Sequence, residues 1–506
     1  MTDTDSQDKS AVARGAGLAF LGRLGALVEV ISLPVFERLY GLATLGIFLA
    51  LFALMRVMTY AAEFAMNTCL QRFVPAAEAD EDVVHGYLRA ALMISGGLSV
   101  ATAGVIAAAA PYLAALLNAA DADAAHLTAI IRLYAWVLPL WVFVEVATGA
   151  IRARRVFGPE IRVRIFYEQG LRLVAGIGFF FAGFLSYGLF LAHLASLFIA
   201  ALLSLHLLSQ HYDLGRMLTA RLPRDRFREL FSVGAHMMPA TACTFALTDL
   251  PVLLLNLLIP GASGAVAAGI YGIARKIASV LHIVRESFEY VLAPLTSERN
   301  ANAGIAAVQA MYSYATRLSC GFVIILGAGL VATRHDILLL FSPQSTAAGA
   351  VIIVLAAGRA FEACTGPSAA VIKMLGHRAL PALNSLAGIA VMAGLQFWLA
   401  PRYGAFGAAI ATAIALNVTA LLYLAQCHAL HGLRPHDAKI FRPLLIALVS
   451  AALIWPAGQA LTALGPGPHF VLCLGAVVTG VVVLLRFGLS SDDASALGRL
   501  GRLARS

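Results

Sequence analysis

The chain has 506 residues, of which 60% are hydrophobic and only 12% are charged. A soluble domain carries roughly 25% charged residues, so this composition excludes an ordinary water-soluble protein and predicts one that resides in a membrane. The formal net charge of +9 does not indicate nucleic-acid binding, because the basic residues recur in short clusters between apolar runs.

Apolar runs long enough to cross a membrane follow one another along the whole chain. A helix needs about 20 apolar residues to span the roughly 30 Å hydrocarbon core. The connections between the runs are short, and no water-soluble domain is inserted. We therefore predict an all-α integral membrane protein with 14 transmembrane helices, at residues 13–36, 42–66, 86–110, 128–151, 163–184, 186–209, 231–257, 266–294, 311–332, 348–373, 379–400, 404–427, 440–462 and 469–489.

The loops differ in their content of lysine and arginine, which predicts the orientation of the chain. If the N-terminus is cytoplasmic, 24 of these residues lie on the cytoplasmic side and three, Arg38, Arg334 and Arg402, lie on the opposite side. Cytoplasmic loops of membrane proteins carry an excess of positive charge. We expect both termini to be cytoplasmic.

The two halves of the sequence resemble each other at a nearly constant offset. The pattern E-x-x-T-G at residues 145–149 recurs at residues 362–366, and segment 187–195 recurs as segment 403–411. The offset spans six helices, so both copies keep the same orientation. We predict two parallel-repeat lobes around a central cavity, an N-lobe in residues 1–215 and a C-lobe in residues 216–432. Two C-terminal helices and a tail follow in residues 433–506.

Charged residues inside the predicted spans are the candidate site residues. An ionisable group at the bilayer centre costs several kcal/mol, so each needs a partner or an aqueous cavity. The candidate substrate-binding cations are Arg23, Arg56, Arg275, Lys276, Arg285 and Arg359. The candidates for ion coupling or charge pairing are Glu29, Glu145, Asp249, Glu289 and Glu362.

Arg56 and Arg275 occupy matching places in the two copies, because each lies 19 residues before a proline, Pro75 or Pro294. We expect them to face each other across the cavity, with Arg23 as a third cation. Arginine binds phosphate through two parallel hydrogen bonds, so this group favours an anion-binding site. The alternative is that these arginines only pair with carboxylates in the membrane.

Other charges are expected to be structural. Arg359 with Glu362 and Arg172 with Glu168 have the spacing that lets two charges pair within one helix. The 13 histidines form no HxxxH or HExxH pattern and the six cysteines form no CxxC pattern. We therefore predict no metal site, no catalytic residue and no cofactor.

Three segments resemble a known family. They are residues 14–78, with Gly22–Gly25 and Arg72–Pro75; residues 269–295; and the most specific, residues 366–376 followed by 401–412. Together they resemble the polysaccharide flippases of the multidrug/oligosaccharidyl-lipid/polysaccharide exporter superfamily, and the resemblance covers nearly the whole chain.

The resemblance implies a flippase of a bacterial inner membrane. Its substrate would be an undecaprenyl-pyrophosphate-linked oligosaccharide for O-antigen, capsule or exopolysaccharide, moved from the cytoplasmic to the periplasmic leaflet by alternating access. Arg23, Arg56 and Arg275 match the places of the family's cavity arginines. The implied partners are the lipid-linked substrate, membrane lipids and the polysaccharide polymerase and export machinery, without nucleic acid. Transport would be driven by the membrane potential or by exchange for H+ or Na+.

Two other functions are considered. A cation-coupled multidrug exporter of the same superfamily would need an apolar cavity with acidic residues, whereas the candidate cavity here is basic. A membrane-bound polysaccharide polymerase or glycosyltransferase would need carboxylates or a metal site, usually on a sizeable loop. The loops of this chain are short, which makes the enzyme the weaker alternative.

Overall fold

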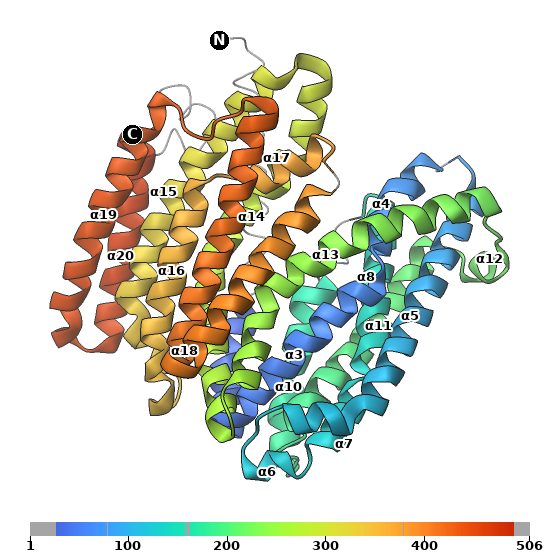
Figure 1. Cartoon of the computed structure of the whole chain (residues 1–506), viewed down its shortest axis with the longest axis horizontal. Coiled ribbons are helices and arrows are strands. Elements are labelled where there is room, and N and C mark those ends of the chain that lie inside the picture. The colour runs from blue at the N-terminus through green and yellow to red at the C-terminus, as the bar shows by residue number, and fades with distance from the viewer. Residues whose placement is uncertain (1–26, 78, 157, 159–161, 378, 490–506) are drawn as a thin grey trace. The chain divides into compact units, whose positions relative to one another are not determined.

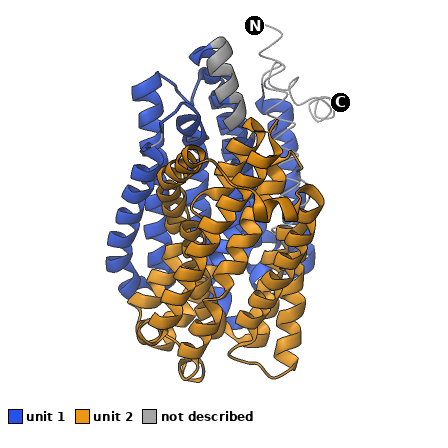
Figure 2. Cartoon of the chain, turned by 90° about the vertical axis from the view of Figure 1, so that its right-hand side faces the viewer, with its two compact units in different colours: residues 1–24, 273–506 blue, residues 25–272 orange. Residues whose placement is uncertain are grey.

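The computed structural model describes residues 27–489 apart from residues 78, 157, 159–161 and 378. All the secondary structure in this part is helical, which confirms the predicted all-α membrane fold. The chain forms two compact units (Figure 2). Unit 2 ends at Gly272, and the described part of unit 1 begins at Ile273. This division falls inside helix α14, Ala262–Ala303, whose first residues belong to unit 2.

The helices run in chain order through both units. Unit 2 contains α2 Leu27–Tyr40, α3 Leu42–Glu63, α4 Met66–Ala76, α5 Glu81–Leu116, α6 Asp121–Ala124, α7 Leu127–Tyr134, α8 Val137–Ala153, the π-helical turn η2 Arg162–Tyr167, α10 Glu168–Phe181, α11 Gly188–His211, α12 Leu214–Thr219 and α13 Arg224–Leu258. Unit 1 contains the rest of α14, α15 Ile305–Leu338, η3 Pro343–Ala347, α16 Ala348–Cys364, α17 Ser368–Met374, α18 Leu380–His431, η4 Ala438–Ile440, α19 Phe441–Ala460, η5 Leu461–Leu464, α20 Pro466–Val483 and η6 Leu484–Gly488.

Eleven helices in the described part are long and apolar enough to cross a membrane (Figure 1). One of them, α18, contains two predicted spans, 379–400 and 404–427. Gly404 separates the two with φ 57° and ψ −137°, a backbone conformation that glycine adopts far more easily than other residues. Predicted span 163–184 corresponds to η2 and α10, and much of span 13–36 lies outside the described residues. The total of 14 spans therefore remains a prediction.

Two predicted spans are interrupted. Span 348–373 was expected to be one helix, but α16 ends at Cys364 because Gly366 has φ 70° and Pro367 has no N–H for the helical ladder. Span 42–66 continues into α4 after a break at Phe64 and Ala65, both with φ 57°. Positive φ is uncommon for residues other than glycine, and nothing in the sequence signalled this break.

Helices α3 and α14 cross at two glycines, Gly46 and Gly269. A methyl group added at Gly46 would collide with the backbone of Ala265 and would lie 2.8 Å from the Gly269 amide nitrogen. A methyl group added at Gly269 would lie 2.7 Å from the carbonyl oxygen of Leu42. Gly46 therefore lies against Ala265, four residues before Gly269, and Gly269 lies against Leu42, four residues before Gly46. Small residues at such a crossing let two membrane helices approach closely.

The division into units differs in position from the predicted lobe boundary at residues 215 and 216. Unit 2 also includes α13, because α13 packs along α3. The assignment of lobes rests on the sequence repeat, and it remains a prediction.

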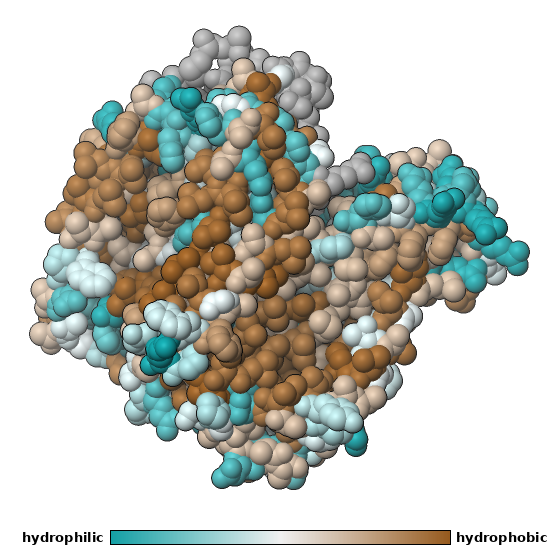
Figure 3. All heavy atoms as spheres, in the orientation of Figure 1, coloured by the Kyte–Doolittle hydropathy of each residue, from teal (hydrophilic) through white to brown (hydrophobic). Residues whose placement is uncertain are grey.

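Unit 1 presents large apolar side chains on its outer helices. Leu445 and Leu453 on α19 are 62% and 66% exposed, and Val471 on α20 is 65% exposed. Hydrophobic side chains also make up much of the surface that α18 and its neighbours present in Figure 3. Such a surface is stable in lipid and would be unfavourable in water.

Candidate functional site

The predicted site residues fall into two groups, one in each unit. Arg23 lies outside the described residues. Unit 2 holds Glu29, Arg56, Glu145 and Asp249, and unit 1 holds Arg275, Lys276, Arg285, Glu289, Arg359 and Glu362. Because Arg56 and Arg275 belong to different units, their placement across a cavity remains a prediction.

In unit 2, Arg56 of α3 forms an ion pair with Asp249 of α13. Arg56 Nη1 lies 3.5 Å from Asp249 Oδ1, and the Asp249 side chain is fully buried whereas that of Arg56 is 28% exposed. The guanidinium also lies 5.2 Å from the centre of the Phe245 ring, on which Tyr60 stacks at 3.5 Å. The pair offsets a buried negative charge, and the exposed edge of Arg56 leaves N–H donors for an anion.

Glu145 of α8 forms a second buried ion pair in unit 2. Its Oε1 lies 2.6 Å from Nη2 of Arg164, which is carried by η2. Nothing in the sequence singled out Arg164 as this partner. The π-helical turn that holds it is a rare local structure found most often near functional sites.

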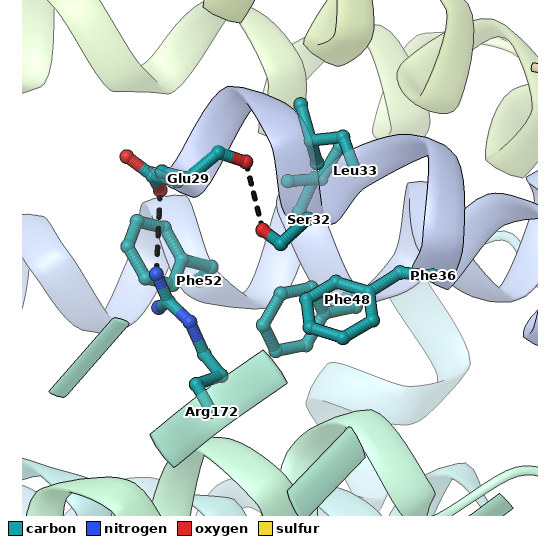
Figure 4. Close-up of a pocket in the computed structure, with 8 residues that line it drawn as sticks. Glu29, Ser32, Leu33, Phe36, Phe48, Phe52 and Arg172 are labelled. Carbon is teal, nitrogen blue, oxygen red and sulfur yellow. Dashed lines mark hydrogen bonds and ion pairs between the residues drawn. The ribbon is translucent and has the colours of Figure 1, made fainter. Parts of the chain in front are cut away.

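Glu29 of α2 pairs with Arg172 of α10 (Figure 4). Arg172 Nη2 lies 3.6 Å from Glu29 Oε1, and Ser32 Oγ donates a hydrogen bond of 2.8 Å to the Glu29 carbonyl oxygen. Phe52 lies beside the guanidinium, 5.7 Å from its carbon to the ring centre. Arg172 also donates a hydrogen bond to the Gln169 side chain of its own helix and interacts electrostatically with Glu168, so the predicted pairing with Glu168 remains a prediction.

In unit 1, charged residues of α14 and α16 form one network. Arg285 contacts Glu362 and lies 3.0 Å from Glu289. Arg359 lies 2.7 Å from Glu362, as its spacing predicted, and 3.3 Å from Nδ1 of His282. The guanidinium groups of Arg285 and Arg359 and the carboxylates of Glu289 and Glu362 offset each other here, and Glu286, 3.4 Å from Nε2 of His282, adds a third carboxylate. The network supports the pairing alternative for Arg285 and Arg359, and their predicted role as substrate-binding cations remains untested.

The remaining predicted cations lie earlier on α14. Lys276 is buried and Arg275 is half-buried. Ser279 donates a hydrogen bond of 2.6 Å to the carbonyl oxygen of Lys276. The assignment of Arg275 and Lys276 to a substrate site stays a prediction.

The two copies of the pattern E-x-x-T-G, one in each unit, make similar hydrogen bonds and helix contacts. Thr148 Oγ1 donates to the Val144 carbonyl at 2.7 Å, and Thr365 Oγ1 donates to the Glu362 carbonyl at 2.7 Å. A side chain on either glycine would clash with a neighbour, Asn67 for the first copy and Thr316 for the second. In each copy the pattern therefore combines a buried, paired glutamate with a close helix contact.

His193 of α11 is a buried polar residue that was not among the predicted site residues. Its ring is fully buried, and its Nδ1 lies 2.7 Å from the Tyr134 hydroxyl oxygen. The repeat contained a signal for it, because the matching position of the second copy is Ala409. A polar residue that breaks a repeat of apolar ones could have been singled out on that ground.

The sequence of the chain matches one protein-family model. The family model described as polysaccharide biosynthesis protein matches residues 12–299. No curated protein matches significantly.

Several solved structures are similar in fold. The lipid II flippase MurJ, in an inward closed conformation, is 11% identical with a TM-score of 0.70 over 93% of this chain and 97% of that one. An inward-facing multidrug resistance MATE family transporter of the MOP superfamily is 14% identical with a TM-score of 0.67, over 81% and 94%. A MOP superfamily transporter from Pyrococcus furiosus is 15% identical with a TM-score of 0.63, over 85% and 98%. At these identities the likeness shows the fold alone.

Proposed function

The chain belongs to the polysaccharide biosynthesis protein family, a family of membrane transporters and flippases and not of enzymes, and from this premise we propose which substrate it moves. The substrate is an undecaprenyl-pyrophosphate-linked oligosaccharide, transferred from the cytoplasmic to the periplasmic leaflet of a bacterial inner membrane by alternating access. The observation that carries the proposal is the family match over residues 12–299.

Arg56 supports the part of the proposal that concerns the anionic headgroup. It lies deep within the span of α3, yet 28% of its side chain is exposed, and it uses one nitrogen to reach Asp249. A pyrophosphate oxygen offers the same acceptor chemistry as a carboxylate and carries more charge. In this proposal the headgroup binds the free edge of Arg56, with Arg23, Arg275, Lys276, Arg285 and Arg359 as further cations of the cavity.

The energy for transport has two candidate sources. An inside-negative membrane potential favours outward movement of an anion by about 2.3 kcal/mol per charge per 100 mV. Exchange for H+ or Na+ would instead use a carboxylate in the membrane, for which Glu29, Glu145, Asp249, Glu289 and Glu362 are the candidates. Asp249 suits exchange, because a headgroup that attracts Arg56 weakens the hold of Arg56 on that carboxylate.

A cation-coupled multidrug exporter is the second candidate. It is favoured by the fold shared with the MATE transporters and by two carboxylates that a cationic drug could use, Asp249, which is fully buried, and Glu29, which is 20% exposed. The two functions differ in the charge of the cargo, and a genetic test separates them.

The test is polysaccharide production in a strain lacking this gene. The strain is complemented with wild type, Arg56→Ala, Arg275→Ala or Arg23→Ala at matched membrane abundance, and with Arg132→Ala as a control, because Arg132 is exposed on α7. We expect lipid-linked repeat units to accumulate on the cytoplasmic face of the deletion strain, and only wild type and the control to restore polysaccharide. Normal polysaccharide with increased sensitivity to cationic drugs would instead identify an exporter.

A further inference from the structure

Aromatic side chains surround His193 in unit 2. Four aromatic rings have their centres 5.2–6.2 Å from the imidazole ring, and these belong to Phe48, Phe52, Tyr134 and Trp141. The imidazole itself is fully buried. A histidine in such a place must satisfy both of its ring nitrogens without water.

Only one of the two ring nitrogens of His193 has a hydrogen bond in the part of the chain that the structure describes. Nδ1 lies 2.7 Å from the Tyr134 hydroxyl oxygen. Nε2 is buried without a hydrogen-bond partner, and the nearest carboxylate oxygen, Oε1 of Glu168, lies 3.9 Å away. That distance is too long for a hydrogen bond and short enough for an ion pair once the ring is protonated.

The charged groups near His193, and the tyrosine to which it is hydrogen-bonded, come from several helices. Glu168 and Arg172 lie on α10, Glu29 on α2, and Tyr134 on α7. The ion pair of Glu145 with Arg164 is also close enough to influence Glu168.

With Glu29, Glu145 and Glu168 all ionised, these three carboxylates and the guanidinium groups of Arg164 and Arg172 leave one negative charge among the described residues named here while His193 is neutral. Glu63, which Glu145 influences, and Arg152, which offsets Glu63, add one charge of each sign. Arg56 and Asp249, whose charges also reach this region, balance each other. A net charge in a buried site is unfavourable, and one bound proton would remove it.

We propose that His193 and Glu168 form a buried proton-binding site in unit 2, in which the proton binds at Nε2 and Glu168 closes onto it. The doubly protonated ring then donates through Nδ1 to the Tyr134 hydroxyl oxygen and through Nε2 to the carboxylate, so both nitrogens are satisfied. The ligand is a proton and not a metal ion, because Arg172 already supplies a fixed cation. The described residues also contain no group of three or more metal-ligating side chains.

The site also connects to a second helix. Arg172 is one turn from Glu168 on α10 and lies 3.6 Å from Glu29 on α2, whose side chain is 20% exposed. A proton held by His193 and Glu168 weakens the attraction of Glu168 for Arg172, which favours the contact of Arg172 with Glu29. If the proposed transport function is correct, the bound proton is therefore the coupling ion, and α2 is the helix that responds to it.

The binding site itself is tested by ¹⁵N NMR of imidazole rings in the purified full-length protein in lipid nanodiscs. The His193 signal is assigned by its loss in His193→Gln. We expect it to become doubly protonated as the pH is lowered, with Glu168 as the counter-charge. Glu168→Gln should lower the proton affinity of His193 at least about tenfold, because it removes the counter-charge. Glu229→Gln, an exposed change on α13, should leave that affinity unaltered.

A His193 signal that stays in one neutral form throughout, or one unaffected by Glu168→Gln, overturns the site. The coupling role is tested in the complemented deletion strain, where His193→Gln and Glu168→Gln should each reduce polysaccharide at least about tenfold. His206→Gln is the matched control, because His206 is exposed on the same helix. Full activity of both variants overturns the coupling role. A deletion strain with normal polysaccharide overturns the proposed function and leaves the NMR result to decide the site.

Discussion

The carboxylate of Asp249 is fully buried, and the Arg56 guanidinium 3.5 Å away offsets its charge. Removal of one member of such a pair leaves the other charge uncompensated. The cost here should be about 2–3 kcal/mol, below that of a fully buried pair, because Arg56 is partly exposed to solvent. Loss of activity in Arg56→Ala alone could therefore reflect loss of stability.

A double variant separates these two effects. We expect Arg56→Ala to lower the thermal stability of the purified protein, and Arg56→Ala combined with Asp249→Asn to recover most of it, because no lone charge remains. Polysaccharide production should stay absent in both if Arg56 binds the headgroup. A double variant that is as unstable as the single one would show that the pair does not determine stability.

At the scale of elements, we expect the backbone to be strained at the break between α3 and α4. Ala65 is buried with φ 57°, which costs about 1 kcal/mol for a residue other than glycine. Ala53 is equally buried in the helical interior of α3. Ala65→Gly should therefore raise thermal stability relative to Ala53→Gly, although both lose the same methyl group.

Thermal unfolding of the two variants in the same detergent provides the measurement. The expected gap between them is about 2 kcal/mol, since glycine costs about 1 kcal/mol within a helix and relieves a similar strain at the break. Equal melting temperatures would mean that the break carries no strain.

The crossing of α3 and α14 brings Gly46 and Gly269 close to the backbone of the facing helix. Leucine at Gly46 or at Gly269 would collide with the backbone of the facing helix, and a backbone cannot rotate away as a side chain can. We expect each substitution to cost about 3 kcal/mol or more, at the upper end of overpacking effects. Gly104→Leu is the control, because Gly104 on α5 has open space around it.

These losses should appear as lower melting temperatures and lower membrane abundance. Destabilisation by Gly104→Leu equal to that by Gly46→Leu would contradict the role of the crossing.

At the scale of the whole molecule, the predicted orientation can be tested with single cysteines. Arg402 lies beside the kink of α18, between two predicted spans and on the side expected to be periplasmic, whereas Arg221 lies in a loop expected to be cytoplasmic, and both side chains are exposed. In a background with the six native cysteines replaced, a membrane-impermeant maleimide should label Arg402→Cys in intact cells. It should label Arg221→Cys only after the membrane is opened. The reverse pattern would invert the topology.

Much of the fold could be predicted, because a membrane-spanning helix needs a long apolar run that is visible in the sequence. Long apolar runs predict the spans, and Pro367, which has no N–H for the helical ladder, lies just beyond the end of α16 within predicted span 348–373. The break at Phe64 and Ala65 could not be predicted, because neither residue favours a turn, and surrounding packing must hold it.

The charged residues of the candidate site could be predicted from the sequence, whereas the contacts between them could not. Burial cost singles out an ionisable residue in a membrane span, so Arg56 and Asp249 could be selected from sequence alone. Their pairing could not, because it depends on how α13 packs along α3. The same holds for the contact of Arg172 with Glu29, which depends on how α2 packs against α10.

Gly46-Ile47-Phe48 matches Gly269-Ile270-Tyr271 in the sequence repeat, so the two crossing glycines occupy matching places in it, and each lies against the residue four positions before the other. Such reciprocity is what an isologous interface between two identical subunits produces. The contact between α3 and α14 is thus the form expected if two separate copies of a shorter ancestor once met as a homodimer at this same glycine.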